Sequence, residues 1–103
     1  DDVTVVVCDE FGRTPKINVH GGRDHWPGLC TLALAGGGLN HGQVIGTSST
    51  KAEYPTSGAY EPKDLMATLF HVLSIDPAMQ ADDFNGRPNY LLPTGAKVIS
   101  ELV

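Results

Sequence analysis

The stretch "VTVVVC", residues 3–8, decides the fold that we expect for this chain. Valine is β-branched, and β-branched side chains are enriched in strands. A continuous run of this kind is typical of a strand that is buried on both faces, as in a parallel sheet covered by helices. The run therefore predicts a buried strand at the start of an α/β layer structure.

Outward from this run, the chain offers further strand signals and long loops. "LCTLALAGGG", residues 29–38, predicts a second buried strand closed by a glycine turn. "GQVIGTS", residues 42–48, predicts a short strand or a bend. Residues 47–60 are rich in Ser, Thr, Gly and Pro, which indicates an exposed loop. Residues 96–103 are too few for periodicity to distinguish a short helix from a strand.

The helix is expected in "EPKDLMATLFHVLSIDP", residues 61–77. Pro62 suits the first helical turn, where its missing N–H costs nothing. Leucines recur every four residues and predict the buried face, at Leu65, Leu69 and Leu73. Asp76 precedes a proline, which ends the helix there. His71 lies off the leucine stripe, so we expect it at the surface.

The composition limits the classes of function. The length of 103 residues suits one domain, and the net charge of −5 argues against a nucleic-acid surface, which needs clustered Lys and Arg. No apolar run is long enough to span a membrane, and no signal peptide is present. Because the chain begins "DDVTVVV" without Met, we interpret it as a fragment of a longer protein. Cys8 and Cys30 lie in apolar runs and are expected as small buried hydrophobes, or as a disulfide between adjacent strands.

Candidate functional residues gather in the polar loop over residues 9–28, which starts where the first strand ends. In open α/β sheets, ligands bind beyond the carboxyl ends of the strands. A loop of this length is usually functional or disordered. Because it also contains Phe11, Ile17 and Trp26, we expect it to be ordered and packed.

One interpretation of this loop is a divalent metal site. Asp24 and His25 offer a carboxylate and an imidazole, and Glu10 or Asp9 would supply the third ligand. Such ligands suit zinc or manganese.

Two other interpretations use the same loop. In an oxyanion site, Arg13, Lys16 and Arg23 would hold a phosphate or sulfate together with glycine N–H groups. In a structural loop, Arg23 and Asp24 would pair with their neighbours and pin the loop, while Trp26 would cover an edge of the core. The residues alone leave all three interpretations open, and no nucleophile stands out in the chain.

Several strings, taken together, resemble a known family. They are "EFGRTPKIN", "GGRDHW", "LAGGGL", "GQVIG", "DLMATLFHVLSIDP" and "GRP". They are similar to the C-terminal part of the bacterial domain-of-unknown-function family numbered 1501, and the resemblance covers nearly the whole chain. Proteins of that family are several times longer and often carry a twin-arginine export signal. The resemblance therefore implies an exported, periplasmic parent.

That family in turn resembles the alkaline phosphatase and sulfatase superfamily. The likeness implies an α/β fold, an alkaline-phosphatase-like sheet with flanking helices, of which residues 1–103 form a C-terminal portion. Glu10-Phe11-Gly12 stands where the superfamily has a metal-binding Asp-His-Gly turn, although Phe11 cannot bind a metal. His25 matches a later metal-binding histidine. The residues that match a sulfatase helix are Asp64, Leu65, Thr68 and Leu69.

The function implied by the resemblance is metal-dependent hydrolysis of phosphate or sulfate esters. Glu10, Asp24 and His25 would hold a divalent ion, zinc, manganese or calcium, and Arg13 or Arg23 would contact the oxyanion. The expected partners are the missing N-terminal portion, which would carry the nucleophile, and a small-molecule ester or anion. The isolated chain is expected to be inactive. The alternative is a non-catalytic binding or scaffold protein on the same fold that has lost metal ligands.

Overall fold

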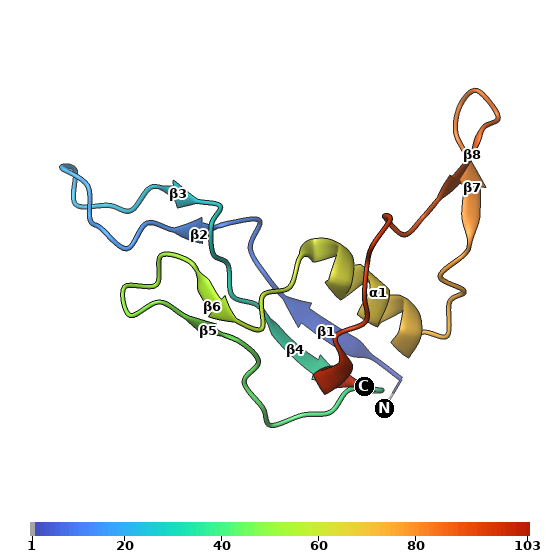
Figure 1. Ribbon diagram of the computed structural model, residues 1–103, viewed down its shortest axis with the longest axis horizontal. Coiled ribbons are helices and arrows are strands. Elements are labelled where there is room, and N and C mark those ends of the chain that lie inside the picture. Colours follow the sequence, from blue (N-terminus) through green and yellow to red (C-terminus); the bar gives the residue numbers. More distant parts are fainter. Residues whose placement is uncertain (1) are drawn as a thin grey trace. The chain divides into compact units, whose positions relative to one another are not determined.

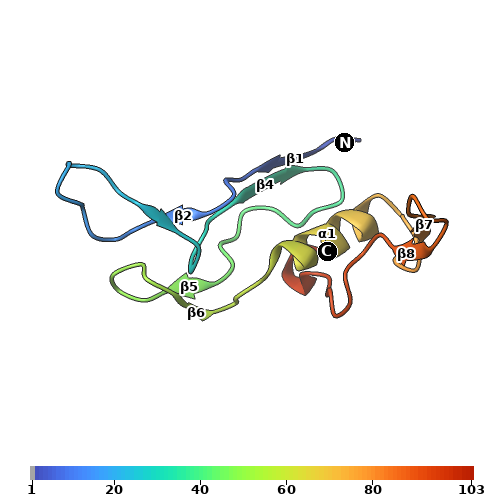
Figure 2. The same ribbon diagram turned by 90° about the horizontal axis from the view of Figure 1, so that it is seen from above.

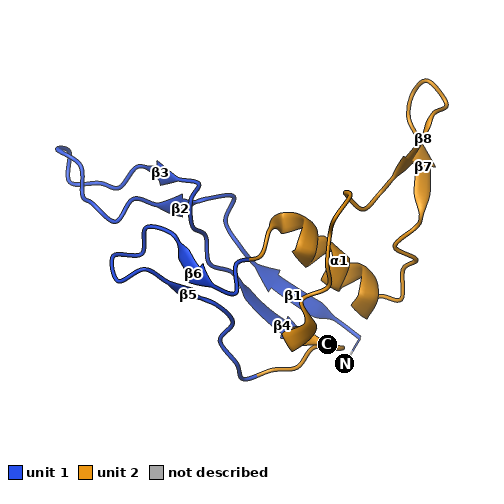
Figure 3. Ribbon diagram, viewed as in Figure 1, with its two compact units in different colours: residues 1–36, 42–59 blue, residues 37–41, 60–103 orange. Residues whose placement is uncertain are grey.

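The computed structural model describes residues 2–103, which form two compact units. Unit 1 comprises residues 1–36 and 42–59, and unit 2 comprises residues 37–41 and 60–103 (Figure 3). Each unit is described by itself.

The described strands form two-stranded antiparallel pairs. Those of unit 1 are β1 (Thr4–Val7) with β4 (Ala33–Gly36), β2 (Gly12–Arg13) with β3 (His25–Trp26), and β5 (Thr47–Ser48) with β6 (Pro55–Ser57) (Figure 1). Unit 2 holds the helix α1 (Pro62–Val72), the pair β7 (Gln80–Asp82) and β8 (Pro88–Tyr90), and the 3-10 helix η1 (Ser100–Leu102).

The expected alkaline-phosphatase-like α/β sheet with flanking helices is wrong. Within residues 2–103 the strands pair in small antiparallel ribbons, and α1 is the single α-helix. The physical reason lies in the connection between the two longest strands. A parallel pair needs a crossover, usually a helix, and the segment that joins β1 to β4 contains none. The chain therefore returns in the opposite direction.

The ribbon of β1 and β4 has one open apolar face. The two strands lie side by side in both views (Figures 1 and 2). The facing pairs on the open side are Val5 with Ala35 and Val7 with Ala33. Val5 and Val7 are 49% and 64% exposed, whereas Val6 on the other face is half-buried. The expected burial of the valine run on both faces is therefore wrong.

The later strand predictions are correct in place but too long. β4 covers four residues of the expected 29–38, and β5 covers the last two of 42–48. Residues 47–60 are mostly exposed, as predicted, although β5 and β6 pair within them. At the base of this hairpin a Cβ on Gly58 would lie 2.7 Å from the Cα of Gly46. Only glycine permits so close a backbone approach.

Helix α1 is confirmed, and its ends have clear causes. At its start, the Asp64 carboxylate accepts the Glu61 N–H at 2.9 Å in a capping box, with Pro62 in the first turn. At its end, Ser74 adopts φ 54°, and the Ile75 N–H donates to the Phe70 carbonyl at 2.8 Å. This is a Schellman motif, which satisfies the last carbonyls and ends the helix before the predicted Asp-Pro.

The core of unit 2 lies on a different face of α1 from the one that the leucines predict. Leu65 and Leu69 are half-buried, and Leu73 is 59% exposed. The buried residues of the unit are Gly37, Leu39, Asp64, Ala67, Thr68, Phe70, Ile99 and Leu102. Thr68 is fully buried, and its hydroxyl oxygen accepts the Ile99 N–H at 2.9 Å. That hydrogen bond holds the C-terminal segment against the side of the helix that carries Ala67 and Thr68.

Smaller predictions have mixed outcomes. Cys8 and Cys30 are exposed and free, so both their burial and the disulfide are wrong. His71 is exposed, as predicted. Residues 96–103 contain the short η1 rather than a strand. Among residues 2–103, no helix combines the length and the hydropathy that a membrane crossing needs.

Candidate functional site

The candidate residues lie on the hairpin of β2 and β3 in unit 1. Gly12 pairs with Trp26, and Arg13 pairs with His25. The hairpin continues past the strands, because the Thr14 N–H donates to the Asp24 carbonyl at 3.0 Å. Residues 9–28 are therefore an ordered hairpin, as their apolar residues indicate.

Asn18 holds the tip of this hairpin together. Its Oδ1 accepts the N–H groups of His20 and Gly22, both at 3.0 Å. Its Nδ2 donates to Asp24 Oδ1 at 3.0 Å, and its backbone N–H donates to the Gly22 carbonyl at 2.8 Å. Asparagine suits this position because its short amide can satisfy backbone groups two to four residues away. The sequence signal for this role is the asparagine three residues before the glycine pair Gly21-Gly22.

Arg23 and Asp24 are both used within the loop. Arg23 Nη1 donates to the carbonyls of Thr14 and Pro15 at 2.7 and 2.6 Å. Asp24 accepts from Asn18 through its side chain, and its N–H donates to the Thr14 hydroxyl at 3.0 Å. These contacts agree with the structural interpretation, in which both residues pin the loop.

Arg13 has a different environment from Arg23. Its guanidinium carbon lies 5.7 Å from the centroid of the Phe11 ring, within the range of a cation–π contact. Its Nη1 makes one long hydrogen bond, 3.5 Å, to the Arg23 carbonyl. The Phe11 ring also stacks on His25, with centroids 4.0 Å apart and planes at 29°. Arg13 thus lies over the Phe11 ring, and one of its N–H donors makes a hydrogen bond within the described residues.

A hollow of about 280 Å³ adjoins this group. Its lining residues are Asp9, Phe11, Gly12, Arg13, Leu29, Cys30, Thr31 and Ala52. The Cys30 thiol lies 3.6 Å from the Asp9 carbonyl and links the two sides. Asp9 lies in the hollow with Arg13, whereas Glu10 does not line it. Sequence reasoning missed Cys30 and Thr31 because it did not pair the segment after β1 with the segment before β4.

The three predicted metal ligands do not fit a metal site by themselves. In the described part of the chain, no three His, Cys, Asp or Glu side chains gather in a way that could hold an ion. Asp24 accepts from Asn18, and the His25 ring stacks on Phe11. Glu10, Asp24 and His25 therefore do not gather as one set of ligands within residues 2–103.

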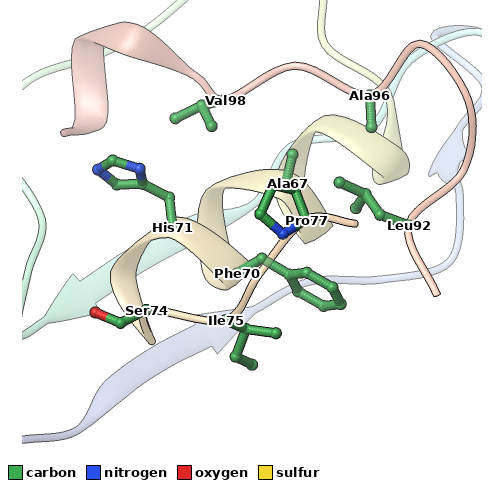
Figure 4. Close-up of a pocket in the computed structure, with 9 residues that line it drawn as sticks. All are labelled: Ala67, Phe70, His71, Ser74, Ile75, Pro77, Leu92, Ala96 and Val98. Carbon is green, nitrogen blue, oxygen red and sulfur yellow. The ribbon is translucent and has the colours of Figure 1, made fainter. Parts of the chain in front are cut away.

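A second hollow, of about 400 Å³, lies in unit 2 between α1 and the C-terminal segment (Figure 4). The side chains around it are Ala67, Phe70, His71, Ser74, Ile75, Pro77, Leu92, Ala96 and Val98. Apart from His71 and Ser74 they are apolar. This hollow lacks the charged groups that an anion or a cation needs, so it is a weaker candidate for chemistry.

The indole of Trp26 joins two hairpins of unit 1, because its N–H donates to the Glu53 carbonyl at 2.6 Å. Trp26→Phe keeps an aromatic ring but removes this donor. We expect the free energy of unfolding of unit 1 to fall by about 0.5–1.5 kcal/mol. Amide hydrogen exchange over residues 47–57 should become faster. Tyr54→Phe, an exposed position in the same hairpin, is the control and should leave exchange unchanged. If amide exchange over residues 47–57 is equally slow in Trp26→Phe and Tyr54→Phe, the indole N–H does not stabilise this hairpin.

The comparison with known families covers the whole chain. A family described as a protein of unknown function (DUF1501) matches residues 1–103. The chain belongs to the DUF1501 family. No curated protein and no solved structure matches it. The resemblance of this DUF1501 chain to its family is therefore confirmed, while its likeness to the alkaline phosphatase and sulfatase superfamily stays a prediction.

Proposed function

We propose that this DUF1501 chain takes part in the hydrolysis of phosphate or sulfate esters and that Arg13 binds the oxyanion. The observation that carries the proposal is the position of Arg13, at a hollow of about 280 Å³ and above the Phe11 ring. A guanidinium presents several N–H donors in one plane, which matches the oxygens of a phosphate or sulfate.

The neighbours of Arg13 add to this chemistry. Thr31 and Asp9 also line the hollow, and their side chains carry a hydroxyl and a carboxylate. The hydroxyl can donate to a non-bridging oxygen of the ester. The carboxylate can accept the proton of an attacking water. Donors placed where negative charge develops lower the barrier, since they need no reorganisation during the reaction.

A divalent ion on Glu10, Asp24 and His25 is the other element that the superfamily resemblance implies. These three side chains do not gather within residues 2–103. That observation favours a second candidate function, in which the hollow binds the anion without hydrolysing it. The separation of the three residues is the reason to measure binding and turnover independently.

The test compares two arginines of the same chain. Arg13→Gln removes the charge at the hollow, and Arg87→Gln removes an exposed charge from the β7–β8 hairpin. We expect Arg13→Gln to weaken binding of inorganic phosphate and sulfate about tenfold or more, because charged hydrogen bonds contribute about 1.5–3 kcal/mol. Arg87→Gln should bind phosphate and sulfate as tightly as the unmodified chain does. Calorimetry measures binding by this chain. Because the chain is expected to be inactive by itself, release of nitrophenol from its phosphate and sulfate esters is measured together with the segment that would supply the nucleophile.

Each outcome has one meaning. Ester hydrolysis, together with binding that only Arg13→Gln loses, supports the hydrolase. Loss of this hydrolysis when a chelator is added would show that a metal ion takes part. Binding without turnover supports the anion-binding alternative. Equal binding by the parent chain and Arg13→Gln would overturn the assignment of this site.

A further inference from the structure

The tip of the β2–β3 hairpin displays aliphatic side chains among positive charges. We call this tip the cationic loop; it consists of Lys16, Ile17, Val19, His20 and Arg23. Val19 is 95% exposed and Ile17 is 56% exposed. Residues 11–23 contain three Lys or Arg and no Asp or Glu, although the whole chain has a net charge of −5. The loop is therefore a local cationic and apolar patch on an acidic protein.

The structure holds this patch in a fixed shape. Asn18 satisfies the N–H groups of His20 and Gly22, and Arg23 bridges the carbonyls of Thr14 and Pro15. A loop whose backbone groups are already paired loses little conformational entropy on binding. The polar contacts of the loop thus keep two aliphatic side chains in water, which is the arrangement of a docking surface.

The β7–β8 hairpin of unit 2 displays the opposite charge around apolar groups. We call this surface the acidic hairpin; it consists of Asp76, Met79, Asp82, Asp83 and Phe84. Phe84 is fully exposed at the tip, and Met79 is 47% exposed. Asp83 Oδ1 accepts the N–H groups of Asn85 and Arg87 at 2.8 and 3.0 Å, which fixes the turn beneath Phe84. Arg87 is the one cation among residues 75–90.

We propose that the cationic loop of one copy of this chain docks on the acidic hairpin of a second copy. Val19 and Ile17 would pack against Phe84 at the centre, where water is excluded, and the charged groups would surround them. Protein interfaces combine an apolar centre with a polar rim in this way. Complementary charge at the rim favours this partner over a surface of the same sign.

The two patches differ, so the contact is heterologous. Each copy would keep one loop and one hairpin free, and association would continue head to tail or close into a ring. The extent of association should therefore increase with concentration. It should decrease with salt, because exposed charges are screened.

The first test measures the mass of the chain by sedimentation across a range of concentrations. Val19→Asp and Phe84→Ser should each weaken association about tenfold or more, as loss of a central contact does. Val44→Asp is the matched control, because Val44 is 94% exposed in unit 1 but lies outside the loop. All three positions are exposed, so the variants should fold, and circular dichroism verifies this.

The second test exchanges charges. Lys16→Glu and Asp82→Lys should each weaken association, and the double variant should restore it. A chain that is monomeric at every concentration would overturn the proposal, and so would a double variant no better than the singles. If Val44→Asp weakens association as strongly as Val19→Asp does, a different surface mediates the contact and the proposal is overturned. Cross-links between Lys16 and Asp82 within a monomer would place the contact inside one chain and also overturn it.

Discussion

Thr68→Val is expected to lower the free energy of unfolding by about 1–3 kcal/mol, because it leaves a buried backbone N–H without a partner. Thr68 is fully buried, and its hydroxyl has two roles. It donates to the Asp64 carbonyl at 2.8 Å within α1 and accepts the Ile99 N–H at 2.9 Å. Valine has nearly the same shape, so the loss would come from the hydroxyl alone. Urea denaturation followed by circular dichroism measures the change.

Thr68→Ser is the matched control. Serine keeps the hydroxyl and removes one methyl group, which contributes about 1 kcal/mol when it is buried. If the hydroxyl holds the C-terminal segment, the amide of Ile99 should exchange rapidly with solvent in the valine variant and slowly in the serine variant. Protection of Ile99 in both variants would contradict this account.

Asp64→Asn is expected to destabilise unit 2 at neutral pH and to remove part of its sensitivity to acid. The Asp64 side chain is only 8% exposed. One carboxylate oxygen accepts the Glu61 N–H, and the other accepts the Lys97 N–H, each at 2.9 Å. An asparagine has one acceptor oxygen, so its amide group would face one of these donors. Either the helix start or the C-terminal segment therefore loses its hydrogen bond.

The pH dependence follows from the direction of one pKa. The hydrogen bond from the Glu61 N–H, and then that from Lys97, hold the pKa of Asp64 below its ordinary value of 3.8. The stabilisation is complete above pH 3.8 and is lost as the pH falls through the lower folded-state pKa. Stability curves of the parent chain and of Asp64→Asn should therefore converge in acid. Parallel curves over that range would show that the carboxylate is not the cause.

Other acidic groups titrate in the same range but should cancel in this comparison. The pKa of Asp83 is lowered by the Arg87 and Asn85 N–H groups, and that of Glu101 is lowered by the Tyr60 hydroxyl. Both residues are present in the parent chain and in the variant. The difference between the two curves thus isolates Asp64.

The sequence predicted local features well where one short segment determines them. Pro62 at the start of α1 acts within a few residues of the chain, and it is where the pattern placed it. The valine run also forms a strand. Its direction, however, depends on the partner, and Ala33–Gly36 returns antiparallel after a segment without a helix. Strand propensity contains no information about that choice.

The buried face of α1 was mispredicted for a similar reason. Leucines at four-residue intervals indicate an apolar stripe, but Asp64 and Thr68 make hydrogen bonds to Lys97 and Ile99, about thirty residues away in sequence. These contacts hold the C-terminal segment against the side of the helix that carries Asp64 and Thr68, whereas Leu73 is exposed. Hydrophobic periodicity cannot represent a buried polar contact of this kind.

For the candidate site, residue type was a better guide to the region than to the roles. Phe11, Ile17 and Trp26 correctly indicated that the loop is ordered. The difference between Arg13 and Arg23 depends on which carbonyls lie within reach, and only the folded hairpin determines that. The arginine with fewer partners is the one that we expect to bind an anion.

The single tryptophan of the chain has a practical consequence. Trp26 lies in unit 1, whereas α1, the single α-helix among the described residues, lies in unit 2. Indole emission should therefore follow unfolding of unit 1, and helical ellipticity should follow unfolding of unit 2. Two optical signals recorded in one titration would show whether the units unfold together. Coincident transitions would indicate a single cooperative system, and separate midpoints would give each unit its own stability.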